Sequence, residues 1–465
     1  MLPHTTTAAV LALLLGATAV AQDPPRRGGR RPAPASQEAK PAPEKPAEKA
    51  EEKPAKPEPK PIALTNATVW VGDGRKLSRA TVLLKGDKIE AVGVDVEVPE
   101  GAETRDLEGL HVCPGFLMLG ARGMGSNTPG QGETFEDARD PFDKTIERGL
   151  AVGITSIVAE ADAGSAMPGG RAGVLKLIPG ELEGGVVEEK AWYTMRVPLG
   201  PEGWRKLEEA VEKARKYEDE KAEYEKKKAA GDDKAKAPKE DKALEALREV
   251  MSGDVPLLVR GSGAQAGGMW GRQQSALPLK QCREALRIAR LIGHGVILEN
   301  PYEGWAIADE IAATGSSAIL VPRFEVPVDE TREEPNGSRF DLPGAFAKAG
   351  IVFFPTVPPG GFGGGPYIGD GGLLGRDFNT PTYDACFAVR GGLPEELGLC
   401  TLTSWPAKML GLDDRLGTLE AGKDADLLIL DGDPLGYKTL VKEAIVGGKV
   451  RYRKDRSQIF KSVGR

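Results

Sequence analysis

Two glutamates close apolar segments in the middle of the chain. Glu160 ends "SIVAE" and Glu299 ends "GVILE", and both are expected at the carboxyl ends of buried strands. A pair of carboxylates can perform acid–base chemistry without a metal. Arg122 and Arg260 also fall near strand ends, where they can neutralise the glutamates as ion pairs. The residues therefore leave two interpretations open, metal-free carboxylate catalysis and internal ion pairing.

Histidine is scarce in this sequence. The 465 residues include 3 histidines, His4, His111 and His294. Histidines and carboxylates at strand ends are the groups that bind catalytic zinc and acidify its water. His4 lies in an expected signal peptide, His111 precedes the first central strand, and His294 begins a strand rather than ending one. We interpret His111 and His294 as structural, and we expect no Ser/His/Asp triad.

The elements that would position these side chains are apolar strands alternating with helical segments. Continuous apolar strands covered by helices indicate a parallel sheet buried on both faces. Repeated units of this total length favour a (β/α)₈ TIM-like barrel over residues 113–416, with an open doubly wound sheet as the alternative. The strand segments are "GITSIVAEA", "AGVLKLI", "VPLLVRG", "GVILEN", "SAILVPR" and "GIVFFPT".

Both ends of the ordered sequence have a different character from the middle. Residues 62–112 contain short alternating strands separated by Gly-Asp-Gly and Gly-Asp turns, a pattern typical of hairpins. Residues 417–465 have the same character. The overall class is thus α/β, with a small composite β-sandwich built from both ends of the chain.

The first 61 residues predict export. An apolar run followed by Ala19-Val20-Ala21 resembles a secretory signal peptide over residues 1–21. Residues 22–61 are almost wholly Pro, Ala, Lys, Glu and Arg, which indicates a disordered tether. We expect a periplasmic or extracellular protein that is not transmembrane, because no later stretch has the ~18 consecutive apolar residues of a membrane helix. The net charge of −7 argues against nucleic acid as the main partner, and a homo-oligomer is left open.

Three further features add candidates for function. Residues 204–251 are dense in Lys and Glu and predict an exposed helical insertion, a lid or partner arm or a solvated excursion. The glycine-rich segment 358–375, which contains Asp370, suits either a lid or an ordinary surface loop. Cys113, Cys282, Cys386 and Cys400 are interpreted as buried free thiols, with a Cys386–Cys400 bridge as the alternative.

Two segments carry a family resemblance. "LEGLHVCPGF" and "TSWPAKMLGLDDRLGTLEAGKDADLLILDGDPL" resemble the strand leading into the barrel and the final helix and return strand of the amidohydrolase superfamily. The sequence is most similar to the imidazolonepropionase-like and prolidase-like branch. The resemblance implies a barrel with a composite sandwich, zinc or a similar divalent metal, and hydrolysis of a non-peptide C–N bond. The implied substrate is a cyclic amide or a dipeptide-like molecule.

The chain departs from the family at its metal-ligand positions. Alignment on Pro114-Gly115-Phe116 puts Met118 at the family's aspartate, Gly120 at its first metal histidine and Arg122 at its second. Glycine has no side chain and arginine stays protonated, so neither can ligate zinc. The remaining ligand positions, on strands five, six and eight, hold Arg260, Asn300 and Val357. Lys176 is the nearest candidate for a strand-four lysine.

These substitutions predict a protein without a metal cofactor. Two guanidinium groups stand where histidines would hold a cation, so the pocket keeps positive charge and can bind a small anionic or amide-containing molecule. We expect a non-catalytic or metal-independent binding or scaffold member, a pseudoenzyme. The alternative is an active amidohydrolase with an atypical site. The catalytic candidates are Glu160 and Glu299, and the substrate- or anion-binding candidates are Arg122, Arg260, Asn300, Lys176 and Asp370.

Overall fold

The computed structural model describes most of the chain after the predicted tether. The expected signal peptide, nearly all of the tether, Val357, Asp370 and most of the glycine-rich segment lie outside the described residues. Among the residues that are described, no helix is long and apolar enough to cross a membrane. The described ranges are 59–130, 132–160, 166–232, 234–261, 264–265, 273–356, 367–368 and 381–457.

A sheet of nine strands forms the barrel, in the order β15-β14-β13-β10-β9-β8-β7-β6-β16. The six apolar segments named from the sequence are all strands of this sheet, which confirms the predicted barrel. The strands are β6 (Phe116–Gly123), β7 (Ile154–Glu160), β8 (Gly169–Lys176), β9 (Val186–Arg196), β10 (Leu257–Arg260), β13 (Ile297–Glu299), β14 (Ser317–Leu320), β15 (Phe353–Pro355) and β16 (Tyr367–Ile368).

One barrel strand runs against the others. β8 pairs antiparallel with β7 and with β9, whereas the remaining pairs of this sheet are parallel. The connections on either side of β8, residues 161–168 and 177–185, are too short for the crossover of a dozen or more residues that a parallel neighbour requires. The "AGVLKLI" segment is therefore a strand, as predicted, but it returns along the barrel instead of repeating the βα unit.

Alternate residues of the barrel strands pack into two different cores. Met195, Val259 and Leu298 belong to a cluster with helical residues such as Leu207 and Leu286. Their neighbours on the same strands belong to a second cluster. Because successive side chains of a strand point to opposite faces, the residues that these strands contribute to the second cluster mark the inner face of the barrel. On β9, β10, β13, β14 and β15 its members are Trp192, Leu258, Ile297, Ile319 and Phe354.

Helices connect the parallel strands and cover the outer face. α5 (Leu279–Ile292) contributes seven buried residues to the outer cluster, at the spacing of an amphipathic helix. α6 (Ala308–Ala313) follows β13, α7 (Leu342–Lys348) follows β14, and α8 (Pro381–Arg390) follows β16. The other short elements are α1 (Phe135–Ala138), α2 (Thr145–Ala151), α9 (Ser404–Met409), β11 (Ala264–Gln265), β12 (Gln273–Gln274), η2 (Gly304–Ile307), η4 (Glu395–Leu397), η5 (Cys400–Leu402) and η6 (Lys454–Arg456).

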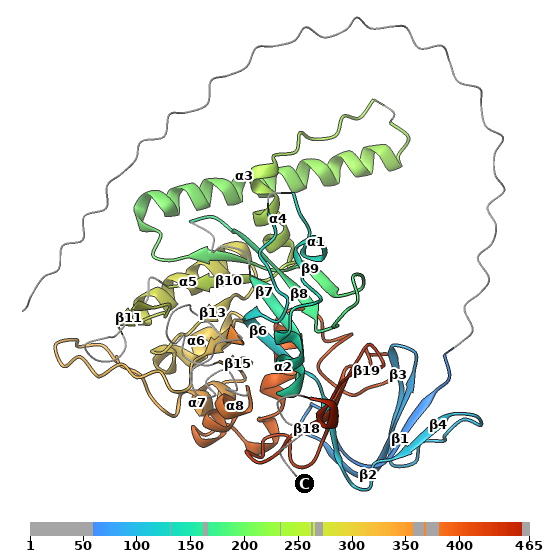
Figure 1. Cartoon of the computed structure of the whole chain (residues 1–465). Helices are drawn as coiled ribbons and strands as arrows, with labels where there is room; N and C mark the ends of the chain where they lie inside the picture. Colours follow the sequence, from blue (N-terminus) through green and yellow to red (C-terminus); the bar gives the residue numbers. More distant parts are fainter. Residues whose placement is uncertain are drawn as a thin grey trace, which may run out of the picture. The chain divides into compact units, whose positions relative to one another are not determined.

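The Lys- and Glu-rich insertion forms two helices of unequal length. α3 (Gly200–Ala229) is a helix of 30 residues, and η1 (Lys242–Leu244) leads into α4 (Glu245–Ser252) (Figure 1). The buried residues of α3 are Leu207, Ala210, Val211 and Ala214, all in its first half. The second half is exposed and carries ion pairs one turn apart, such as Lys216–Glu220 at 3.8 Å.

A second sheet joins the two ends of the ordered chain, in the order β19-β18-β17-β5-β1-β2-β3 with β4 beside β1. β5 pairs parallel with β1 and antiparallel with β17, so it connects the first and last segments of the sequence. This arrangement confirms the predicted composite domain. Its strands are β1 (Ile62–Trp70), β2 (Lys76–Lys85), β3 (Lys88–Gly93), β4 (Glu103–Asp106), β5 (His111–Pro114), β17 (Leu427–Leu430), β18 (Val441–Val446) and β19 (Lys449–Arg453).

The described histidines lie away from the carboxyl ends of the barrel strands. Trp70 Nε1 donates a hydrogen bond of 3.1 Å to His111 Nδ1, within the second sheet. His294 is an exposed residue between α5 and β13 and lies beside Gly253. All four cysteines are free, so Cys386 and Cys400 are not bridged.

Candidate functional site at the carboxyl ends of the barrel strands

Polar residues follow the inner apolar layer on four barrel strands. Each stands two positions after an inner-face residue: Arg196 after Thr194, Arg260 after Leu258, and Glu299 after Ile297. Thr356, just beyond β15, stands two positions after Phe354. Strand alternation therefore places all four on the inner face at the carboxyl ends, where barrel proteins present functional groups. We call Arg196, Arg260, Glu299 and Thr356 the mouth layer.

The structure brings Arg260 and Glu299 together. Arg260 Nε lies 3.1 Å from Glu299 Oε1, and their side chains are 14% and 19% exposed. The Ser275 hydroxyl donates a short hydrogen bond to the other oxygen of Glu299. One of the two predicted Glu–Arg pairs is thus an ion pair that neutralises both members.

Arg196 is the residue that sequence reasoning missed. Its position on β9 is in register with Arg260 on β10, and the Val197 N–H donates a ladder hydrogen bond of 2.9 Å to the Arg260 carbonyl. Arg196 is exposed, and it forms no ion pair or hydrogen bond through its side chain with any described residue. The available signal was its place at the end of the apolar run "AWYTMR", which was not assigned to a barrel strand.

Two buried polar atoms near the mouth layer have no hydrogen-bond partner among the described residues. Asn300 follows β13, is 2% exposed and has a left-handed backbone with φ of 47°. Its backbone N–H donates to Ile319 O and its carbonyl accepts from the Leu277 N–H, whereas its side-chain Nδ2 is unpaired. The Thr356 hydroxyl is likewise unpaired in a residue that is 9% exposed. Buried donors of this kind favour a bound acceptor.

The backbones of Arg122 and Glu160 occupy neighbouring strand ends. Ala121 on β6 is in register with Ala159 on β7, so the next positions are Arg122 and Glu160. Their side chains lie outside what the structure describes. The backbone register is thus compatible with the predicted pairing of Arg122 with Glu160. The pairing itself stays a prediction.

At the ligand positions predicted from the resemblance, the described residues do not fit a divalent metal. Gly120 offers no donor atom, and the guanidinium of Arg260 is a cation already bound to Glu299. Asn300 has an amide, a weak ligand for zinc. Within the described ranges, no group of three His, Cys, Asp or Glu residues is placed to hold a metal ion. We therefore derive no chemistry through a metal at this site.

Lys176 was wrongly assigned to the pocket. Its Nζ lies 2.8 Å from Asp424 Oδ2 and 2.9 Å from Asp426 Oδ2. Because β8 is reversed, its last residue pairs with Ser156, near the amino end of β7. Lys176 therefore lies at the opposite end of the barrel, where the barrel meets the second sheet.

Lys176, Asp424 and Asp426 are buried together, and the lysine and the two aspartates affect one another's pKa. Burial alone would lower the pKa of Lys176, but Asp426 and Asp424 outweigh it and raise that pKa. Burial opposes ionisation of Asp424 too, yet hydrogen bonds from Lys176 and Lys88 hold its pKa below the usual value. For Asp426, burial dominates and raises the pKa. We call Lys176, Asp424 and Asp426 the junction cluster.

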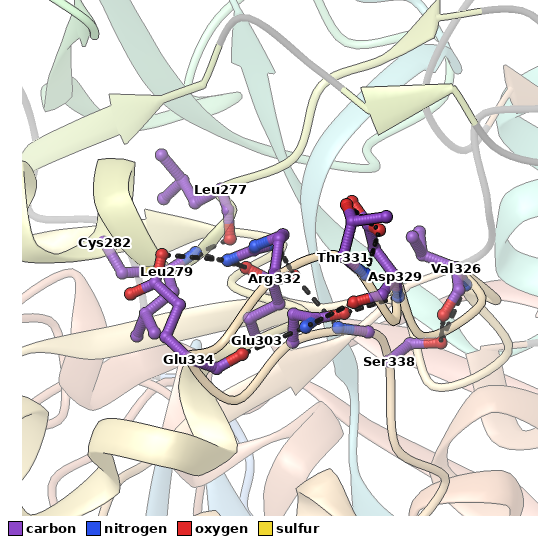
Figure 2. Close-up of polar contacts among 12 residues, drawn as sticks. Leu277, Leu279, Cys282, Glu303, Val326, Asp329, Thr331, Arg332, Glu334 and Ser338 are labelled. Carbon is purple, nitrogen blue, oxygen red and sulfur yellow. Dashed lines mark hydrogen bonds and ion pairs between the residues drawn. The ribbon is translucent and has the colours of Figure 1, made fainter.

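A buried carboxylate next to the mouth fastens a long loop. Glu303, which is 1% exposed, accepts hydrogen bonds from the Leu279 N–H at 2.7 Å, the Gly337 N–H at 3.0 Å and Arg332 Nη1 at 2.8 Å (Figure 2). These bonds tie the segment that follows β14, residues 321–341, to the first residue of α5. Both carboxylate oxygens of Glu303 accept hydrogen bonds from groups of the protein itself, so we assign Glu303 a structural role.

Asp384 on α8 is a second buried carboxylate that the sequence did not reveal. It is 1% exposed, and Arg323 donates to its Oδ1 through Nε at 3.2 Å. Burial raises the pKa of Asp384, and the nearby Arg323 offsets part of that rise. Its Oδ2 has no hydrogen bond among the described residues. Asp384 lies inside a helix, and no sequence motif marks it as a site residue.

A hollow of about 250 Å³ lies away from the strand ends, between α3 and the segment that returns to α4. It is lined by residues such as Lys213, Tyr217 and Lys239. Arg248 lies over the Tyr217 ring, 4.2 Å from its centroid, and donates to Glu240 at 2.9 Å. This hollow belongs to the insertion and is separate from the mouth layer.

Comparisons with known proteins agree with this architecture. A model of the Amidohydrolase family matches residues 375–452. The chain is similar to the amidohydrolase tasK of Hapsidospora irregularis, with 38% identity over 86 residues, 18% of this chain. That match spans only 9% of the length of the curated relative. The crystal structure of an amidohydrolase from Thermotoga maritima MSB8 covers 84% of this chain and 100% of its own, with 26% identity and a TM-score of 0.60.

Residues 375–452 thus resemble the amidohydrolase family in sequence, and most of the chain has the fold of a solved amidohydrolase. The family match lies in the C-terminal part, which includes the quoted return to the composite sheet, and the structural match extends over the barrel as well. In barrels of this fold the carboxyl ends of the strands are the place where a functional site is expected, and the mouth layer lies there.

Proposed function

We propose that this protein is an exported member of the amidohydrolase superfamily that binds a small anion at its barrel mouth and does not carry out metal-dependent hydrolysis. The observation that carries the proposal is the Arg260–Glu299 ion pair of 3.1 Å, and Arg260 holds the position that the sequence resemblance assigns to a strand-five metal ligand. The predicted signal peptide and tether support export.

The charge of arginine opposes a metal at this position. A guanidinium stays protonated at any physiological pH and has no lone pair to donate. A divalent cation placed beside it would meet repulsion in a site that is largely shielded from water, where charges interact more strongly than in bulk solvent. The same guanidinium forms strong bidentate bonds to carboxylates and phosphates. Arginine in place of histidine thus makes the site favour an anion instead of a metal cation.

The state of the glutamate decides how much positive charge is available. Glu299 neutralises Arg260, so that pair alone attracts an anion weakly. Arg196 is beside the pair and is not neutralised by any described residue. Their combination keeps the mouth layer positive, and it supports a binding role over a purely structural one. Asn300 and Thr356 add unpaired buried donors.

A thermal-shift screen tests this proposal. Acetate, phosphate and a neutral amide of similar size are added to the purified full-length protein, with and without zinc or manganese. We expect stabilisation by an anion, no stabilisation by the amide, and no dependence on added metal.

A double variant serves as the control. Arg260→Met with Glu299→Gln removes both charges of the pair, so neither is left buried alone. The anion response should fall in this variant while its unliganded melting temperature stays near that of the parent. The proposal fails if no anion stabilises the protein, if the double variant responds like the parent, or if an amide is hydrolysed only when metal is added.

A further inference from the structure

We infer that the mouth layer binds a small monocarboxylate, held between Arg196 and Arg260, and that Arg196 supplies the charge that selects it. This inference rests on the proposed function and names the ligand class of the same site.

The register of β9 and β10 puts the two arginines side by side. Arg196 is directly opposite Arg260, in the same ladder as Thr194 opposite Leu258. Neighbouring parallel strands are about 4.8 Å apart, and side chains in register lie on the same face. Two guanidinium groups thus start from adjacent points on the inner face. A planar carboxylate has two oxygens that can each accept from a separate guanidinium.

The exposure of the two arginines differs in a way that suits binding. Arg260 has a side chain that is 14% exposed and is fixed by Glu299. Arg196 is exposed at the end of a strand whose preceding residues, Thr194 and Met195, are buried. The fixed arginine can orient a ligand and the exposed one can meet it from solvent.

The four residues of the mouth layer carry a net charge of +1. Arg196 and Arg260 contribute two positive charges and Glu299 one negative charge, while Thr356 is neutral. Arg122 and Glu160, at neighbouring strand ends, add one charge of each sign. A monoanion therefore neutralises the site, whereas a dianion such as a phosphate monoester would leave an excess negative charge next to Glu299.

Thr356 offers the second recognition group. Its hydroxyl lies on the same inner layer, at the end of β15, and lacks a partner among the described residues. A hydroxyl can donate to or accept from a ligand group beyond the carboxylate. Because Thr356 and Arg260 lie on strands separated by β13 and β14, the ligand must reach across the mouth to contact both.

Isothermal titration of the full-length protein with four probes tests the inference. The probes are propionate, propionamide, succinate and ethyl phosphate, at about pH 8, where the phosphate carries two charges. We expect propionate to bind about tenfold more tightly than either dianion, and propionamide to show no measurable binding. Arg196→Gln should weaken propionate binding about tenfold or more.

Arg290→Gln is the matched control, because Arg290 is an exposed arginine of α5 on the outer side of the barrel. It should bind propionate like the parent. The inference is overturned if succinate or ethyl phosphate binds more tightly than propionate, or if Arg196→Gln binds propionate like the parent. Those results would leave the proposed function standing, provided that anion binding still depends on Arg260. Failure of all three anions to bind would overturn both.

Discussion

The two ends of the barrel carry ion clusters that differ in whether their charges are satisfied. In the junction cluster, Lys176 lies between Asp424 and Asp426, and Lys88 and Arg415 also contact Asp424, at 2.6 and 3.1 Å. In the mouth layer, Arg260 is paired with Glu299 but Arg196 has no partner among the described residues.

This difference separates a cluster that holds the fold together from one that is suited to binding. Buried charges persist only when they are paired, and removing one partner is costly because the other remains buried. The junction cluster meets that condition and joins the barrel to the second sheet. An exposed arginine without a partner contributes little to stability, so its position at the strand ends points to recognition.

The largest effect is expected from breaking the junction cluster. Lys176→Met leaves Asp424 and Asp426 buried without their shared cation, which should destabilise the protein by about 3–5 kcal/mol. Urea denaturation of the full chain measures the change. Lys206→Met, at an exposed lysine of α3, is the control and should change stability by less than about 0.5 kcal/mol. A loss below about 1 kcal/mol for Lys176→Met would contradict a stabilising role for the junction cluster.

Breaking the mouth pair should cost less. Arg260→Met alone leaves Glu299 partly buried and unpaired, and we expect a loss of about 1–3 kcal/mol. Adding Glu299→Gln should recover part of that loss, because the uncompensated charge disappears. The difference between the single and double variants, measured by denaturation, gives the cost of leaving the Glu299 charge without Arg260. Equal stabilities of both variants would mean that the uncompensated charge of Glu299 costs nothing.

The ion pair between Glu181 and Arg451 lies at the surface, and its contribution to stability should depend on pH. Hydrogen bonds from Arg451, with further contributions from Lys449, lower the pKa of Glu181 to about 2. A carboxyl with a lowered pKa stabilises the fold above its unfolded value of 4.5 and loses that contribution as the pH falls toward 2. Glu181 is 41% exposed, so Glu181→Gln should cost less than about 1 kcal/mol at neutral pH.

Melting temperatures of Glu181→Gln and the parent, measured from neutral pH down to the lowest pH at which both stay folded, check this. The difference between the two proteins should shrink as the pH falls below 4.5. A difference that grows on acidification would contradict the assignment.

The smallest effect on stability is expected at Arg196. Because its side chain is exposed and unpaired among the described residues, Arg196→Gln should change the free energy of unfolding by less than about 0.5 kcal/mol. The same denaturation experiment measures it. A loss above about 1 kcal/mol would place Arg196 with the structural charges of the junction cluster instead of with a binding site.

The sequence predicts the fold well because the fold depends on periodicity. Apolar runs such as "VPLLVRG" and "SAILVPR" are buried on both faces, and turn residues separate the strands of the second sheet. The direction of β8 was not predicted, since hydrophobicity does not encode strand direction. The short connections on both sides of "AGVLKLI" indicate a reversed strand, and the reversal places Lys176 at the end of the barrel opposite to the one predicted.

The site was less predictable than the fold. Arg260 and Glu299 were found because each ends a recognisable strand, and their contact follows from adjacent strands β10 and β13. Arg196 ends a strand that the sequence pattern does not predict, and Thr356 lies just before the glycine-rich segment 358–375, whose register no pattern fixes. Asp384 and Glu303 are buried by tertiary packing alone, which single-sequence patterns do not report.

Metal stoichiometry is the measurement that tests the central claim most directly. The full-length protein is incubated with zinc or manganese, freed of unbound metal by gel filtration, and analysed by inductively coupled plasma mass spectrometry. A mouth built on Arg196 and Arg260 predicts far less than one metal ion per chain in the parent, and the same for Arg260→Met with Glu299→Gln. One or two tightly held ions per chain, lost when Glu299 is changed, would contradict the account.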